Sequence, residues 1–219
     1  MQTTIEIVAA IERSPRILAG GGLAVRRTGR DALHLISTAA TPLGGDTIDI
    51  RVIVEPGATL WLGSVAATLA LPSLADRVSR VRWHLEIGDG GRLTVSPLPT
   101  VVAADARHLT EMTVAAAPTA VVHLDEAVQI GRHGETAGTW CGAVAVTVGS
   151  RPVLAHRVDL DNRRRGLVSR FRYPDDRPGV VSTTHLAVRM ALAGDASLTT
   201  ALADSVSAAS TAADSLIDG

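Results

Sequence analysis

Apolar and polar residues alternate along much of the chain, and the clearest case lies in residues 47–54. An apolar residue at every second position is typical of a β-strand with one buried face. Pro56 and Gly57 then favour a turn, after which Leu60 and Leu62 resume the alternation. This segment therefore predicts a strand, a turn and a second strand. The apolar positions of the first strand are Ile48, Ile50, Val52 and Val54.

The same arrangement recurs, with predicted turns near residues 56, 89, 118 and 149. Alternating segments flank each turn, and the turns are about thirty residues apart. Shorter alternating segments at 3–11 and 32–37 precede the first turn. Units of strand, turn and strand at a regular spacing predict a mainly β fold of stacked, hairpin-like units, either solenoid-like or sandwich-like.

The pattern changes after residue 160, where a charged and proline-rich stretch begins. In residues 182–193 the apolar positions fall at helical spacing, and residues 198–217 form a second, weakly amphipathic candidate helix. We therefore expect an all-β body over residues 1–160, followed by a loop and helical region over residues 161–219. Both regions are expected to belong to one domain.

The composition narrows the classes of function. Aromatic residues make up only 2% of the 219 residues, so stacking platforms for single-stranded nucleic acid are not expected. The net charge of −1 gives no reason to expect nucleic acid or an anionic membrane as a partner. Cys141 is the only cysteine, which fits a reducing compartment. Since no signal peptide or membrane-length apolar segment is recognisable, we expect a soluble, cytoplasmic protein.

Signatures of several enzyme classes are absent from the sequence. There is no G-x-S-x-G element, no C-x-x-C pair and no lysine for a phosphate-binding Walker loop. The run Gly20–Gly22 lacks the spacing of a phosphate cradle and favours a connector. The seven histidines are scattered singly, and His34, between apolar residues, is expected to be a core or hydrogen-bonded histidine. We expect no catalytic residues and no enzymatic activity.

Asp46 follows Gly44 and Gly45 directly at the start of the clearest strand. Its carboxylate can cap the turn by accepting hydrogen bonds from backbone N–H groups. Alternatively, it lies where the backbone leaves room for a hard or borderline cation. The residue types alone leave both interpretations open.

A second group of candidate metal ligands lies between residues 123 and 135. His123 and His133 are close in sequence to Asp125, Glu126 and Glu135. These residue types can bind a metal ion, but a solvated strand face would have the same composition. Both interpretations remain open.

Five segments of the chain resemble, in order, segments of the urease accessory protein family UreD, also called UreH. In that family a short strand leads into Gly-Gly-Asp, a second strand and a Pro-Gly turn, which resembles LHLISTAATPLGGDTIDIRVIVEPGATL. An acidic and apolar element followed by G-R-x-x-G-E resembles EAVQIGRHGETAG. The remaining similarities lie in LTVSPLPTVVAADARH, RYPDD and AGDASLT.

This resemblance implies a non-enzymatic component of nickel delivery with a largely β, stacked fold. Members of the family bind the helical accessory protein UreF, which recruits the GTPase UreG, and the assembly docks on the urease apoprotein. Nickel is thought to cross such proteins along a polar internal path. The resemblance therefore implies Ni²⁺ in transit and no permanently bound cofactor.

Carried over by motif, the resemblance implies that three carboxylates contact nickel transiently: Asp46, Glu126 and Glu135. Gly44, Gly45 and Arg132 are motif positions with a structural role. A salt bridge between Arg132 and Glu135 would explain that pair equally well. The chain also departs from the family, because a basic aromatic stretch found in many members reads AATLALP here.

A binding module for a small ligand or a polysaccharide is the alternative from another class of proteins. Such modules usually display a ladder of aromatic side chains on one face. Trp61, Trp83 and Trp140 lie at different phases of the repeated units. Co-purification with a UreF-like partner or binding to sugars would separate the two classes.

Overall fold

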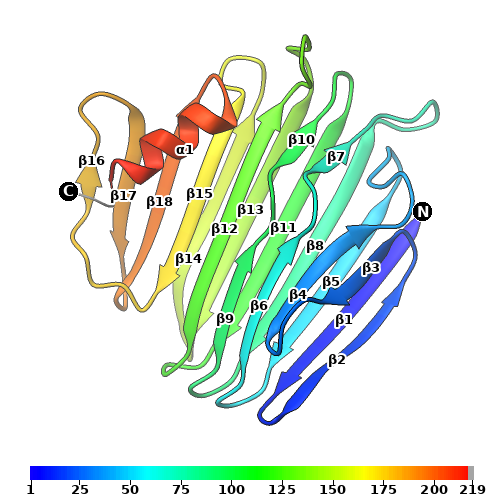
Figure 1. Ribbon diagram of the computed structural model, residues 1–219. Helices are drawn as coiled ribbons and strands as arrows, with labels where there is room; N and C mark the ends of the chain where they lie inside the picture. Colours follow the sequence, from blue (N-terminus) through cyan, green and yellow to red (C-terminus); the bar gives the residue numbers. More distant parts are fainter. Residues whose placement is uncertain (217–219) are drawn as a thin grey trace.

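The computed structural model describes residues 1–216, which form two facing β-sheets and one short helix (Figure 1). The first sheet has seven strands, in the order β14 (Arg151–Leu160), β13 (Thr139–Val148), β11 (Arg107–Ala116), β8 (Val78–Ile87), β5 (Thr47–Val54), β1 (Gln2–Ala10) and β2 (Arg13–Gly20). The predicted mainly β, solenoid-like fold is therefore confirmed.

The second sheet has eleven strands. Nine form a continuous path: β16 (Val180–Val181), β17 (Leu186–Leu192), β18 (Ala196–Ala203), β15 (Gly166–Tyr173), β12 (Val121–Ile130), β9 (Arg92–Ser96), β6 (Thr59–Ser64), β4 (Ala32–Ser37) and β3 (Leu23–Arg27). Two short strands, β7 (Thr68–Ala70) and β10 (Thr100–Val102), pair with each other, and β10 also pairs with β12.

The central strands stack in parallel, one coil above the next. Ile48 of β5 pairs with Val81 of β8, and Val81 pairs with Thr110 of β11, so each position recurs about thirty residues later. Three of the four predicted turns carry the chain from the first sheet to the second, as from β5 to β6, instead of closing a hairpin. Only the turn at Gly149 closes a hairpin, between β13 and β14.

The turns themselves stack as well. The Gly57 N–H donates to the carbonyl of Asp89 at 2.8 Å, and the Gly90 N–H donates to the Thr119 hydroxyl at 2.8 Å. These bonds connect the turns of neighbouring coils. At the ends of the stack the parallel pattern gives way to antiparallel pairs, β1 with β2, β3 with β4 and β13 with β14.

The helix predicted over residues 182–193 is wrong, because this segment contains strand β17. Val188, Met190 and Leu192 also alternate, so the segment fits either period, and pairing with β18 on one side and β16 on the other selects the strand. The candidate helix over 198–217 is partly correct. Its first residues form β18, and only α1 (Val206–Asp214) is helical; residue 217 lies outside the described residues.

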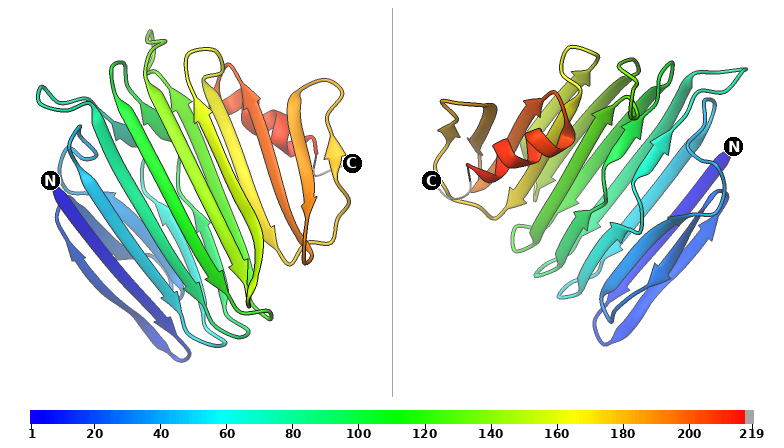
Figure 2. Two further views of the ribbon diagram at one scale, coloured as in Figure 1. Left: turned by 180° about the vertical axis from the view of Figure 1, so that it is seen from behind. Right: turned by 45° about the horizontal axis from the view of Figure 1, so that its top comes forward.

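Helix α1 lies on the outer face of the second sheet, over β15, β17 and β18 (Figure 2). Ser205 caps it by accepting a hydrogen bond from the Ala208 N–H at 3.2 Å. Its buried alanines pack on Val168 and Ala201 of the sheet. No helix in the described part of the chain is long and apolar enough to cross a membrane. The division at residue 160 stays a prediction.

Candidate functional site

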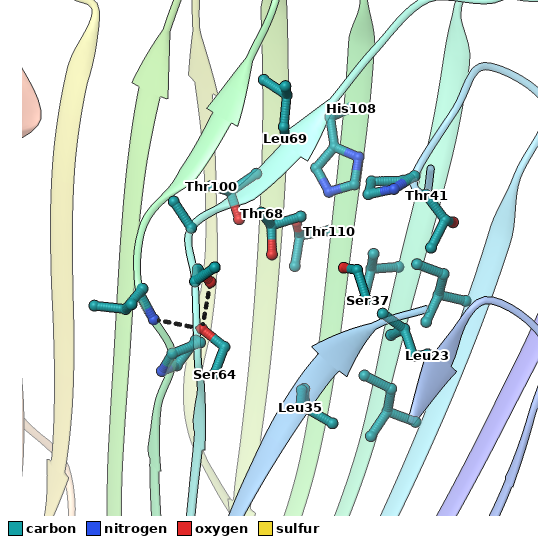
Figure 3. A pocket seen from close by; sticks show the side chains of 18 of the residues that line it. Leu23, Leu35, Ser37, Thr41, Ser64, Thr68, Leu69, Thr100, His108 and Thr110 are labelled. Atoms are coloured by element: carbon teal, nitrogen blue, oxygen red, sulfur yellow. Dashed lines mark hydrogen bonds between the residues drawn. The ribbon is translucent and has the colours of Figure 1, made fainter. Parts of the chain in front are cut away.

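Two neighbouring strands of the second sheet are interrupted at the same level. Strand β6 ends at Ser64 before β7 begins at Thr68, and β9 ends at Ser96 before β10 begins at Thr100. Ser64 connects the two interruptions, because its hydroxyl donates to the Ala66 carbonyl at 2.9 Å and accepts from the Leu98 N–H at 2.9 Å (Figure 3). Behind this break lies a cavity of about 420 Å³ between the sheets.

Both sheets contribute to the cavity wall. The first sheet supplies mainly apolar side chains, among them Ile50, Trp83 and Met112, and the second supplies Leu35 and Val95. Figure 3 shows neutral polar side chains around the same space, including Ser37, Thr68, Thr100 and Thr110. Three half-exposed apolar residues border the break: Val65, Leu69 and Leu98.

Glu126 is the predicted site residue that lines this cavity. It lies on β12 between the buried Leu124 and Val128. Strand β12 pairs with β9 as far as Leu124 and with β10 from Val128 onward, so Glu126 lies level with the gap between β9 and β10. Glu126 is half-buried, and among the described residues its carboxyl group has no hydrogen-bond donor; partial removal from water raises its pKa from 4.5 to about 7. Glu126 is therefore a carboxyl group that loses and gains its proton near neutral pH.

His108 lines the cavity from the first sheet and was not singled out from the sequence. It is 2% exposed, its Nδ1 lies 2.9 Å from the Ser79 hydroxyl, and burial lowers its pKa to about 4. The imidazole is thus neutral at pH 7. The signal was available, because His108 shares the phase of Met112 and Val114 on a strongly alternating strand.

Asp46 lies next to the cavity but does not line it. The side chain is buried and accepts hydrogen bonds from the Thr41 hydroxyl and the Leu43 N–H, both at 2.8 Å, and from the amino group of Met1. Burial alone would raise the pKa of Asp46, but these hydrogen bonds outweigh it and the pKa lies below its usual value. Since Thr41 lines the cavity, Asp46 holds one of its walls in place.

Glu135 lies in the connection between β12 and β13, apart from the cavity wall. It accepts hydrogen bonds from the Arg132 guanidinium and from the backbone N–H groups of Arg132 and Ala104, both at 3.0 Å. The Arg132 side chain is the main reason that the pKa of Glu135 falls to about 2. The predicted ion pair is therefore present, and it organises this turn.

The structure does not bring the three predicted carboxylates together. Within residues 1–216, no group of three or more His, Cys, Asp and Glu side chains is arranged to hold a metal ion. His34 is hydrogen-bonded, as predicted, with its Nδ1 2.8 Å from the Thr28 hydroxyl. The tryptophans form no ladder on one face, since Trp83 and Trp140 are buried and Trp61 packs beside His34 on the second sheet.

Gly44 permits a close approach that a larger residue would prevent. A Cβ atom at this position would lie 1.9 Å from the carbonyl oxygen of Asp76. We expect Gly44→Ala to lower the free energy of unfolding by about 3 kcal/mol, since backbone must move to accommodate the methyl group. Gly20→Ala is the matched control, because nothing lies within 4 Å of its Cβ position. Urea unfolding measures both variants, and equal losses would contradict the prediction.

The stacked parallel coils and the cavity behind a broken sheet define a β-solenoid-like scaffold with an accessible interior. A family model described as UreD urease accessory protein matches residues 21–217. Because this match covers most of the chain, the chain belongs to the UreD family.

Individual relatives support this assignment. The chain is 36% identical over 143 residues to urease accessory protein UreD 1 of Saccharopolyspora erythraea, covering 65% of this chain and 56% of that protein. It is 33% identical over 189 residues to UreD of Parafrankia sp. strain EAN1pec, covering 83% and 62%. It is 41% identical over 116 residues to UreD of Frankia alni, covering 53% and 39%. The matches therefore span less than two thirds of each relative.

Proposed function

We propose that this chain is a non-enzymatic, cytoplasmic scaffold that passes nickel to the urease apoprotein together with UreF and UreG. The observation that carries the proposal is membership of the UreD family over residues 21–217. The cavity supports it, because it offers a space between the sheets and, among the described residues, one lining carboxylate without a donor, that of Glu126. In this proposal Ni²⁺ is the cargo and not a resident cofactor.

The chemistry of Glu126 suits a transient contact with Ni²⁺. Carboxylate oxygens bind hard and borderline divalent cations, whereas cages of thiolate and imidazole ligands hold such ions tightly. One carboxylate without further ligands gives a weak site, which a conduit needs because the ion must leave again. Glu126 is therefore the first nickel contact in this proposal.

Asp46 and Glu135 would contact nickel only after a rearrangement. The oxygens of Asp46 already accept three hydrogen bonds, and Glu135 accepts from Arg132 and Ala104. A cation at either residue would have to replace these donors. We propose them as secondary contacts, used when partner proteins bind and alter the surrounding loops.

Deleting the gene for this chain is expected to leave urease protein present but poor in nickel and inactive. The proposed reason is that the apoprotein folds without its metal, whereas metal loading requires the scaffold. Urease abundance by immunoblot and nickel by mass spectrometry of the purified enzyme measure the two quantities. Reintroducing the wild-type gene is the control. Full urease activity in the deletion strain at limiting nickel would overturn the proposed function.

A further inference from the structure

Three ionisable side chains line the cavity in the described part of the chain, and two of them already have partners. Asp125 accepts a hydrogen bond from the Ser96 hydroxyl at 2.9 Å and pairs with the Arg172 guanidinium. His108 is neutral and bonded to Ser79. Of the three, Glu126 alone has no partner among the described residues, and a carboxylate that is partly removed from water is costly unless it is paired with a donor.

The rest of the cavity wall disfavours the binding of an anion and favours a ligand with an apolar part. No arginine of the described residues lines the cavity, and the chain contains no lysine, so this wall offers no cationic side chain to a negatively charged ligand. The side chains of Ile50, Trp83 and Met112 present apolar surface on the side of the first sheet. A bare metal ion would bind the Glu126 carboxylate, but it would not cover this apolar surface.

The dimensions of the cavity suit a small organic molecule. Its volume of about 420 Å³ falls within the range of ligand pockets, which are mostly apolar with a few placed polar groups. The break in the second sheet leads into it between half-exposed apolar residues, so an apolar guest meets apolar surface on entry. Those residues are Val65, Leu69 and Leu98.

We propose that this cavity binds a small organic cation, in which an ammonium group on an apolar body donates hydrogen bonds to the Glu126 carboxylate. The apolar body fills the space between the sheets, against Trp83 and Met112. The ammonium supplies the donors that Glu126 lacks, and the body removes apolar surface from water. This binding function goes beyond nickel transfer, because it requires no metal and no partner protein.

Three six-carbon probes that differ in charge test the proposal: hexylammonium, hexanol and hexanoate. The titrations are run at about pH 8, with the chain free of nickel. Hexylammonium is expected to bind the nickel-free chain with a Kd of about 1 mM or tighter. It should bind about tenfold more tightly than hexanol, with no binding of hexanoate. Isothermal titration calorimetry measures all three. No binding of hexylammonium, or equal binding of hexanol, would overturn the proposal.

Two variants assign the binding to the cavity. Glu126→Gln keeps the shape of the side chain and is expected to lose the tenfold preference for hexylammonium while hexanol binding persists. Glu86→Gln is the matched control, because Glu86 pairs with Arg51 on the outer face of the first sheet and should leave binding unchanged. Thr68→Phe fills the cavity and is expected to abolish binding of both probes. Unchanged binding by Glu126→Gln or Thr68→Phe would show that the site lies elsewhere.

Failure of this proposal is distinguishable from failure of nickel transfer. The calorimetry uses the isolated chain without nickel, UreF, UreG or urease. A chain that binds no organic cation can still activate urease, and a chain that does not activate urease can still bind hexylammonium. Each result therefore bears on one proposal alone.

Discussion

Glu126→Gln is expected to raise the free energy of unfolding by about 2 kcal/mol at pH 8 and to leave it nearly unchanged at pH 4. The pKa of Glu126 is about 7 in the folded chain, against 4.5 as its ordinary value. Between these values the unfolded chain has lost a proton that the folded chain still holds, so wild-type stability falls as the pH rises. Glutamine carries no charge at any pH and avoids this loss.

Urea unfolding of the wild type and of Glu126→Gln at several pH values measures this effect. The advantage of the variant should grow between pH 4.5 and about 7 and stay constant above. Glu86→Gln, at an exposed and paired carboxylate, should show no such dependence. A stability difference that does not change with pH would mean that the Glu126 carboxyl group titrates normally.

The same variant is expected to impair the proposed function while it stabilises the fold. Without the carboxylate, nickel loading of urease at limiting nickel should fall about tenfold, as for the loss of other groups that support metal sites. Nickel content per urease subunit is the measurement, with Glu86→Gln as control. Normal nickel loading with Glu126→Gln would show that Glu126 does not lie on the nickel path. Nickel transfer would then not explain why the chain keeps a carboxyl group that lowers its stability.

Asp46→Ala is expected to lower the free energy of unfolding by about 3 kcal/mol, because it leaves buried donors without an acceptor. The affected donors include the Thr41 hydroxyl and the Leu43 N–H, both 2.8 Å from the carboxylate. The pKa of Asp46 is depressed in the folded chain, so its contribution is complete above the ordinary value of 3.8. This contribution is lost as the pH falls below that value, so the free energies of unfolding of the wild type and Asp46→Ala should become equal in acid.

Asp46→Asn separates the structural role of this residue from a role in nickel transfer. Its amide oxygen can still accept a hydrogen bond, so we expect a smaller loss of stability than in Asp46→Ala. If Asp46 only caps the loop, the Asn variant should activate urease normally once its folding is confirmed by circular dichroism. A well-folded Asn variant that does not activate urease would assign the carboxylate to the nickel path.

The sequence predicted the fold wherever a local pattern determines the structure. Alternation such as Ile48, Ile50, Val52 and Val54 identified strands, and the repeat of about thirty residues indicated stacking. It could not show that the chain crosses between sheets at Pro56 and Gly57, because arches and hairpins share the same turn residues. The apolar positions of strand β17 satisfy both periods, so the sequence predicts a helix there, and only pairing with β18 decides for the strand.

The cavity could not be predicted because it depends on two neighbouring interruptions in one sheet. The repeat places the segments after Ser64 and Ser96 at equivalent levels, but nothing in the sequence shows that both strands break there. Family resemblance selected Glu126, which lines the cavity, but it also selected Asp46 and Glu135, which do not line it. Distances between such residues come only from the packing of the two sheets.

The antiparallel hairpins at the ends of the stack also affect whether separate molecules can associate through their sheet edges. A bare parallel coil would expose a complete row of backbone donors and acceptors on which a coil from another molecule could continue the stack. The terminal strands β2 and β14 instead carry Pro15 and Pro152, and each pairs with its neighbour across a register shift. Proline and irregular register make poor templates for strand addition. The hairpins therefore make both edges of the first sheet poor places for a second molecule to extend the stack.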